Sequence, residues 1–178
     1  AFSLAALLAG WLVALLLGGL FLTAYSICLI LSLLYSVPPV RAKARAGFDA
    51  LINSIGFGGL TVFAGWAALD RRIASPIVAV ALGFCFLFTA FYPLTQIYQM
   101  DEDRQRGDLT MALALGKRPA LVRALGAAIV AFAFFLGEAA AHYLTWRSAG
   151  LVLAFVLWLA LLIPWLRRWA SSDRRAEQ

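Results

Sequence analysis

Charged residues are scarce in this chain of 178 residues: only 13% are Asp, Glu, Lys or Arg, whereas 63% are hydrophobic. A soluble domain of ordinary composition is about a quarter charged and about half apolar. With so few charged residues, a protein of this size cannot present a polar surface to water. A chain this rich in apolar residues is also neither disordered nor collagen-like. The composition therefore excludes a soluble monomer and indicates a membrane protein.

Cysteine is scarce as well, with two residues in the whole chain. Cys28 and Cys85 both lie inside apolar runs and lack the paired spacing of a metal site. We therefore expect two buried thiols rather than a disulfide or zinc framework.

Long uncharged runs alternate with short polar segments and predict about six membrane-spanning helices. A helix rises about 1.5 Å per residue and the hydrocarbon core is about 30 Å thick, so one crossing takes roughly 17 to 25 residues. Gly18-Gly19 divides the first run, Pro38-Pro39 closes the second, and Ser75-Pro76 suits the start of the fourth helix. The expected helices cover residues 2–17, 20–36, 50–69, 73–100, 119–143 and 148–166, followed by a polar tail over 167–178. The predicted fold class is all-α, a polytopic transmembrane helical bundle that forms a single domain over residues 1–178.

Basic residues are distributed unevenly between the two ends of these expected helices. One side holds twelve of the fifteen: Arg41, Lys43, Arg45, Arg104, Arg106, Lys117, Arg118, Arg123, Arg167, Arg168, Arg174 and Arg175. The other side holds three: Arg71, Arg72 and Arg147. Since Lys and Arg favour cytoplasmic loops, we expect segments 37–48, 101–118 and 167–178 on the cytoplasmic side of a bacterial-type inner membrane. The net charge of +6 then reflects orientation in the membrane rather than nucleic-acid binding.

The densest polar cluster follows the fourth expected helix and contains three adjacent carboxylates at 101–103. Grouped carboxylates commonly hold a hard divalent cation such as Mg²⁺, which bridges to a substrate phosphate. On a helix Gln99 and Asp103 share a face, whereas the other two acids point elsewhere. Two interpretations stay open: a metal site, or a solvated loop whose acids pair with Arg104 and Arg106. Spacing alone favours the loop.

A second polar segment, at 35–45, carries Arg41, Lys43 and Arg45 at alternate positions, with no acid before Asp49. Such an array suits an anionic head group or a diphosphate, which Arg binds in a bidentate manner and Lys as a point charge. Anchoring of a cytoplasmic loop explains the same residues equally well.

Three segments of the sequence, taken together, resemble the motifs of a known protein family. Residues 35–43 read Tyr-Ser-Val-Pro-Pro-Val-Arg-Ala-Lys, and residues 49–58 read Asp-Ala-Leu-Ile-Asn-Ser-Ile-Gly-Phe-Gly. Residues 98–116 run from a tyrosine through the acidic cluster to a Gly-Asp-Leu-Thr turn and a leucine-rich stretch that ends in glycine. In order and separation these segments resemble the UbiA superfamily of intramembrane prenyltransferases, over nearly the whole chain.

The resemblance implies a helical bundle whose central cavity opens to lipid and an enzyme that moves an isoprenoid chain. The donor would be a polyprenyl diphosphate and the acceptor an aromatic or other lipophilic molecule, in quinone, carotenoid or related lipid biosynthesis. The matched positions imply Mg²⁺ ligands at Gln99, Asp101, Glu102 and Asp103. They imply diphosphate contacts at Tyr35, Arg41, Lys43, Arg45, Arg104 and Arg106. Asn53 suits either an acceptor contact or an interhelical hydrogen bond.

The chain departs from the family pattern at two points. The upstream family motif of the form NxxxDxxxD is absent, which predicts an internal fragment that lacks the first Asp-rich motif. Gln99 stands where the second motif usually has aspartate, and a neutral carbonyl binds Mg²⁺ more weakly than a carboxylate. A catalytically altered member that serves as a membrane scaffold therefore stays open as an alternative. A second alternative is a small-molecule transporter. In a transporter, however, polar groups are expected at the membrane midplane, whereas in this chain they lie at the helix ends.

Glu138 and His142 form one more polar pair, four residues apart near the outer end of the fifth expected helix. Ionisable residues inside a membrane are candidates for function, here a proton relay. A snorkelling or paired structural role close to the interface explains the spacing better, and it is the interpretation we favour.

Overall fold

The computed structural model describes residues 2–69, 72–142 and 146–176, and within these ranges the chain forms helices and turns without a β-strand. The elements are α1 (Phe2–Leu17), α2 (Gly19–Ser36), the 3₁₀ turn η1 (Ala42–Ala44), α3 (Phe48–Asn53), the π-helical segment η2 (Ser54–Leu60), α4 (Thr61–Leu69), α5 (Ser75–Arg106), α6 (Met111–Leu115), α7 (Lys117–His142) and α8 (Trp146–Ala176). The all-α prediction is confirmed.

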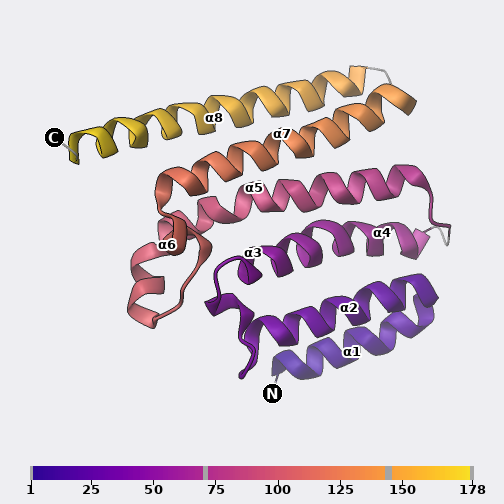
Figure 1. Ribbon diagram of the computed structural model, residues 1–178. Helices are drawn as coiled ribbons and strands as arrows, with labels where there is room; N and C mark the ends of the chain where they lie inside the picture. Colours follow the sequence, from indigo (N-terminus) through magenta and orange to yellow (C-terminus); the bar gives the residue numbers. More distant parts are fainter. Residues whose placement is uncertain (1, 70–71, 143–145, 177–178) are drawn as a thin grey trace.

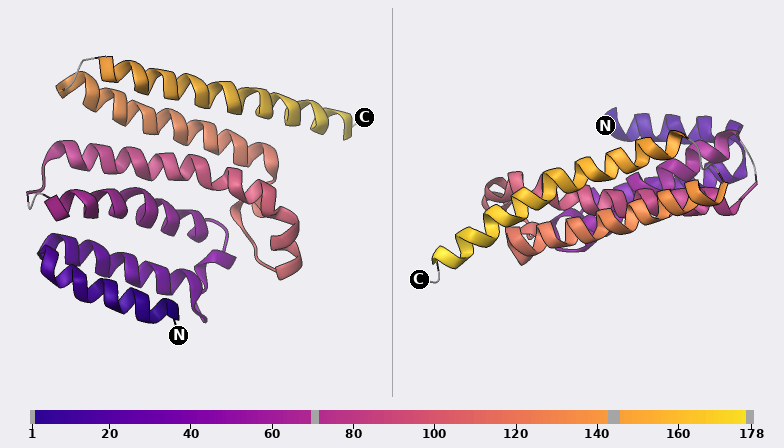
Figure 2. Two further views of the ribbon diagram at one scale, coloured as in Figure 1. Left: turned by 180° about the vertical axis from the view of Figure 1, so that it is seen from behind. Right: turned by 90° about the horizontal axis from the view of Figure 1, so that it is seen from above.

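The long helices follow one another across the bundle in chain order, from α1 and α2 at one edge to α8 at the other (Figures 1 and 2). Helix α5 lies in the middle and packs against α7 on one side and η2 on the other. Because the helices alternate in direction, segments 37–47 and 101–116 and the C-terminal part of α8 lie at one end of the bundle (Figure 1). The polar segments singled out in the sequence therefore meet there.

Within the described ranges, five helices are long and apolar enough to cross a membrane: Gly19–Ser36, Phe48–Leu69, Ser75–Arg106, Lys117–His142 and Ser148–Arg168. The first of the six expected spans, α1, is a 16-residue helix that ends at the predicted break, where Gly18 adopts a φ of 113°. At about 1.5 Å per residue such a helix is about 24 Å long and falls short of a full hydrocarbon core. It lies against α2, where the Trp11 indole N–H donates to Ser26 Oγ at 2.9 Å.

The third expected span is one rod, Phe48–Leu69, built from α3, η2 and α4. Its π-helical middle contains Gly58, which brings the rod against the backbone of α5. A Cβ added there would lie 2.7 Å from the Phe84 carbonyl oxygen and 2.8 Å from Cys85 Cα, so a larger residue would force the helices apart. The Thr61 hydroxyl donates to the Gly56 carbonyl oxygen at 2.8 Å, which satisfies one acceptor in the wider turn.

Several helix ends differ from the prediction. Helix α5 begins at Ser75 as expected but continues past residue 100 to Arg106, so the acidic cluster is helical. Helix α8 continues through the polar tail to Ala176, because that tail is rich in helix-forming residues. The short helix α6 was not predicted, and α7 begins at Lys117 rather than at residue 119. The expected end near residue 143 lies outside the described residues.

Small side chains dominate the core between α5, α6, α7 and α8. The buried cluster consists of Ala90, Ile97, Ala112, Ala120, Leu121, Ala127, Ala128 and Leu162. In lipid the hydrophobic effect does not drive helices together, so they associate through close packing of their side chains. Alanine is small enough to let the helix backbones approach each other. Large apolar side chains point outward instead, such as Leu16 at 83% and Leu161 at 73% exposed. This inverted distribution fits a lipid surrounding.

Candidate functional site

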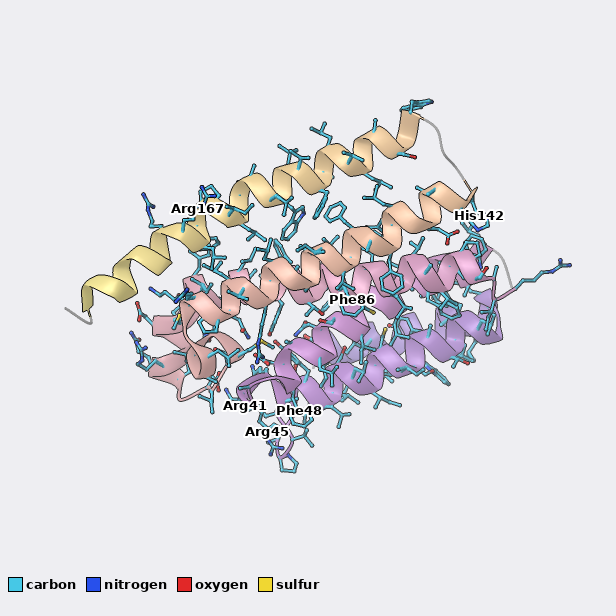
Figure 3. The ribbon with its side chains drawn as sticks, turned by 45° about the horizontal axis from the view of Figure 1, so that its top comes forward. Arg41, Arg45, Phe48, Phe86, His142 and Arg167 are labelled. Atoms are coloured by element: carbon cyan, nitrogen blue, oxygen red, sulfur yellow. The ribbon has the colours of Figure 1, made fainter. Side chains whose placement is uncertain are left out.

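A polar cavity of about 190 Å³ opens at the end of the bundle where α5 finishes, between the 37–47 and 107–110 loops. We call it the polar pocket. It is lined by Tyr35, Arg41, Lys43, Tyr92, Gln96, Gln99, Asp103, Arg106, Asp108 and Thr110. These residues come from α2, the loop that follows it, α5 and the loop that follows α5, and Figure 3 shows Arg41 at this end of the molecule.

Gly107 lies between two residues that line the polar pocket, Arg106 and Asp108, and ends α5 in the left-handed conformation with a φ of 71°. This conformation suits glycine and turns the chain back on itself, so that Asp108 faces the other loop. The Leu109 N–H donates to the Ala44 carbonyl oxygen at 3.2 Å, and Arg45 and Leu109 form a β-bridge. The two loops are therefore joined through their backbones.

Arg41 and Asp108 join the same loops through their side chains. Arg41 Nη2 lies 3.1 Å from Asp108 Oδ1 and 3.3 Å from Oδ2. Arg41 also adopts a φ of 38°, the positive-φ conformation that is uncommon for a residue with a side chain. Strained backbone of this kind persists where surrounding contacts hold it, and it clusters at functional sites.

The charges of the polar pocket do not cancel. Asp103 and Asp108 are 5% and 7% exposed, so both carboxylates are buried. Arg106 Nη2 lies 2.6 Å from Asp103 Oδ1, and Arg106 Nε lies 3.8 Å from Asp108 Oδ2. Within the described part of the chain Lys43 forms no ion pair. Among the lining residues, three cations therefore face two carboxylates, and this local excess of positive charge favours an anionic ligand.

Asp49 lies directly beneath the polar pocket and is fully buried, at 0% exposed. Its Oδ1 accepts hydrogen bonds from the backbone N–H groups of Gly47 and Ala50, both at 2.8 Å. Its Oδ2 accepts from Gln96 Nε2 and, at 3.3 Å, from the Met111 N–H. A buried carboxylate is costly unless its oxygens are satisfied, and here both are.

Gln96 completes this network, since its Oε1 accepts the Ala112 N–H at 3.2 Å. Asp49 and Gln96 thus fix the start of α3, the last third of α5 and the first turn of α6 relative to one another. The sequence analysis assigned neither residue a role. The sequence does contain one indication of this contact: Gln96 lies within an apolar helix, where a polar side chain needs a hydrogen-bond partner.

Tyr35 connects the polar pocket to a second cavity. Its hydroxyl lies 2.9 Å from that of Tyr92, and both rings line the polar pocket. Tyr35 also lines a mostly apolar cavity of about 270 Å³ between α2 and the α3–η2–α4 rod. Its other lining residues are Cys28, Leu31, Ser32, Ser36, Ile52, Asn53, Gly56, Phe57 and Thr61. The polar pocket thus adjoins a mostly apolar cavity, and the two share Tyr35.

The structure brings together six of the residues singled out in the sequence: Tyr35, Arg41, Lys43, Gln99, Asp103 and Arg106. Gln99 and Asp103 share the pocket-facing side of α5, as their spacing predicts. Five others do not line the polar pocket. Asp101 is 89% exposed and pairs with Arg104 at 3.1 Å, while Glu102 is 70% exposed and lies 3.7 Å from Arg106.

Two further residues lie elsewhere. The fourth non-lining residue, Arg45, is exposed, and its backbone forms the bridge to Leu109. Asn53 lines the apolar cavity rather than the polar pocket, and its Nδ2 donates to the Asp49 carbonyl oxygen at 2.8 Å. Asp108 and Thr110 line the polar pocket although the sequence analysis gave them no role.

The polar pocket contains oxygen atoms that could be ligands of a divalent cation. Among the described residues no three His, Cys, Asp or Glu side chains converge, so the chain offers no metal cage made of protein ligands alone. Two carboxylates, Asp103 and Asp108, face the pocket, and the buried Thr110 hydroxyl has no hydrogen-bond partner in the described part. These oxygens fit Mg²⁺, which keeps several waters and shares substrate phosphates.

A family model described as the UbiA prenyltransferase family matches residues 1–178, the whole of this sequence. No curated protein and no solved structure matches the chain.

Proposed function

The chain belongs to the UbiA prenyltransferase family, whose members are intramembrane prenyltransferases. From this premise we propose that it transfers an isoprenoid chain from a polyprenyl diphosphate to an aromatic or other lipophilic acceptor. The observation that carries the proposal is the adjacency of the polar pocket, with its surplus positive charge, to the apolar cavity behind Tyr35. Such a pair of spaces fits the two halves of a prenyl diphosphate.

The polar pocket would take the diphosphate. Arg41, Lys43 and Arg106 supply N–H donors, and the Tyr35 hydroxyl adds another at the boundary with the apolar cavity. When the allylic carbon–oxygen bond breaks, negative charge accumulates on the leaving diphosphate. Cations that are already in position stabilise this charge without reorganising, and this lowers the barrier.

Asp103 and Asp108, with Gln99 and Thr110 beside them, would hold Mg²⁺ against the diphosphate. The ion would neutralise charge on the phosphate oxygens and so improve the leaving group. Arg106 pairs with Asp103 and Arg41 pairs with Asp108, and these ion pairs would hold both carboxylates in place beside the diphosphate. Asp101 and Glu102 are exposed and paired with arginines, so in this proposal they stay outside the metal site.

The apolar cavity would hold the first isoprene units and shield the allylic cation from water. Phe57 lines it from the α3–η2–α4 rod, and aromatic faces stabilise cations. Water exclusion prevents the cation from being hydrolysed before the acceptor reaches it. Asn53 lies in this cavity, near Tyr35, and would contact the acceptor.

In this proposal the polar pocket faces the cytoplasm across a bacterial-type inner membrane. It lies at the end of the bundle to which twelve of the fifteen basic residues are assigned, and Lys and Arg favour the cytoplasmic side. A water-soluble cation and a released diphosphate would then exchange directly with the cytoplasm, while both lipophilic substrates arrive from the bilayer.

The direct experiment supplies membranes carrying the full-length protein with a labelled polyprenyl diphosphate and a panel of quinone-precursor and carotenoid acceptors. We expect a prenylated product that is lost on adding EDTA and restored by excess Mg²⁺. Robust turnover without a divalent cation would contradict the metal part of the proposal. Absence of product with every acceptor, at normal expression, would favour a non-catalytic scaffold.

A further inference from the structure

A third cavity, of about 430 Å³, lies between α5, α7 and α8. Its lining residues are Val80, Phe84, Phe135, Glu138, Ala139, Ser148 and Leu151. We call it the outer cavity. Its volume falls within the range of about 300–1,000 Å³ that is usual for small-molecule sites. Its walls are apolar apart from two side chains, those of Glu138 and Ser148.

Glu138 places a poorly satisfied acceptor in this apolar space. Its side chain is 14% exposed, and Oε1 is buried without a hydrogen-bond partner among the described residues. His142, one turn further along α7, brings Nε2 to 3.3 Å from the same oxygen, within ion-pair distance but outside hydrogen-bond geometry. The carboxylate therefore keeps capacity for one more donor.

The outer cavity is separate from the polar pocket. Along α7 the distance from Lys117 to Glu138 is about 31 Å at 1.5 Å per residue, close to the thickness of a hydrocarbon core. Figure 3 shows His142 at the opposite end of the bundle from Arg41 and Arg45. A head group bound at Glu138 thus cannot reach the proposed site of prenyl transfer.

We propose that the outer cavity binds a membrane amphiphile whose head is a hydrogen-bond donor, a hydroxyl or an ammonium group, on an apolar chain. The head would donate to Glu138 Oε1, and the chain would pack against Phe84, Phe135 and Leu151. A plain lipid tail would fill the volume but leave the buried oxygen without a donor, which is unfavourable for a buried acceptor. The site is additional to the proposed prenyl transfer and does not depend on it.

The test compares three photoactivatable probes of one chain length: a long-chain alcohol, the corresponding amine and the methyl ether of the alcohol, which has no donor. Each is irradiated with the purified full-length protein in nanodiscs, and labelled peptides are identified by mass spectrometry. We expect the amine, the alcohol or both to label Val80, Phe84 and Leu151 with about tenfold higher apparent affinity than the ether. The tighter of the two donors identifies the head.

Three variants make the outcome decisive. In Glu138→Leu the preference for the alcohol or the amine over the ether should disappear. Labelling by the ether itself should persist, which shows that the cavity is intact. In Glu138→Gln, which keeps a carbonyl acceptor but no charge, the alcohol should be retained and the amine weakened. Ala139→Leu should exclude all three probes by filling the cavity. Equal labelling by the ether in the native protein, or a preference that survives Glu138→Leu, would overturn the proposal and indicate bulk lipid.

Discussion

The Gln96 carboxamide joins the Asp49 carboxylate to the backbone of α6, donating from Nε2 to Asp49 Oδ2 while its Oε1 accepts the Ala112 N–H at 3.2 Å. Asp49 and Gln96 are separated by 47 positions in the sequence, and both are buried. The two polar loops that form the pocket end beside this contact, one at Gly47 and the other at Met111. Its geometry therefore sets the position of Arg41 relative to Asp103.

Exchanging the two side chains tests this coupling. Asp49→Asn alone turns an amide donor toward the Gln96 amide, and Gln96→Glu alone brings two carboxylates together. We expect each single variant to lower the free energy of unfolding by about 1–3 kcal/mol, the cost of a buried polar group without its partner. The double variant Asp49→Asn with Gln96→Glu restores one donor and one acceptor between the two side chains but not the acceptor of the Met111 N–H, so thermal stability should recover in part.

The same three variants should be compared in prenyl transfer. A positioning role predicts that the double variant regains both KM for the diphosphate and turnover relative to either single variant. If the double variant were as damaged as the sum of the single ones, the contact would not couple the two loops.

Lys43 and Arg45 provide a matched pair of cations in one loop. Lys43 lines the polar pocket without an ion pair in the described structure, whereas Arg45 lies outside the pocket and is exposed. Lys43→Ala should raise KM for the polyprenyl diphosphate about tenfold, because it removes a charge-assisted contact without exposing a buried partner. Arg45→Ala should leave KM nearly unchanged. The reverse order would show that the diphosphate binds elsewhere on the loop.

Sidedness is tested by cysteine labelling. Ala44 and Gln105 lie in the two segments joined by the Leu109–Ala44 hydrogen bond, so they must face one compartment. In a background without Cys28 and Cys85, we expect Ala44→Cys and Gln105→Cys to react with an impermeant reagent only from the cytoplasmic side. Modification from opposite sides would contradict the arrangement of the spans, and modification of both from outside would invert it.

Gln99 is the position at which the chain departs most clearly from the acidic motif that it resembles. Its side chain shares the pocket-facing side of α5 with Asp103. Gln99→Asp should keep or raise turnover and lower the Mg²⁺ concentration needed for half-maximal activity, because a carboxylate binds this ion better than a carbonyl does. A large loss of activity in a folded Gln99→Asp protein would show that the amide itself is required.

Most of the helices could be predicted from the sequence because apolar runs and Gly or Pro breaks are local signals. Gly18 and Ser75 mark real helix boundaries for this reason. The continuation of α5 to Arg106 was missed because polar composition was taken as the end of the span, although a helix can extend beyond the hydrocarbon core. Helix α6 was missed because five residues carry too little periodicity.

The candidate site could be predicted only in part. Helical spacing was enough to place Gln99 and Asp103 on one face and the exposed Asp101 on another. Pairing between distant loops was not visible in this way, because Arg41 meets Asp108 across 67 positions. The same holds for the network below the pocket, which depends on how α3, α5 and α6 pack.

The central claim, prenyl transfer at the polar pocket, is tested most directly by the transfer rates of Asp103→Asn and Asp101→Asn in the full-length protein. The chemical change is identical, but Asp103 is 5% exposed inside the pocket, whereas the Asp101 side chain is 89% exposed outside it. We predict that Asp103→Asn lowers turnover at least about tenfold, equivalent to about 1.4 kcal/mol of transition-state stabilisation, while Asp101→Asn stays near the native rate. Full activity in Asp103→Asn, with Asp101→Asn inactive, would contradict the site.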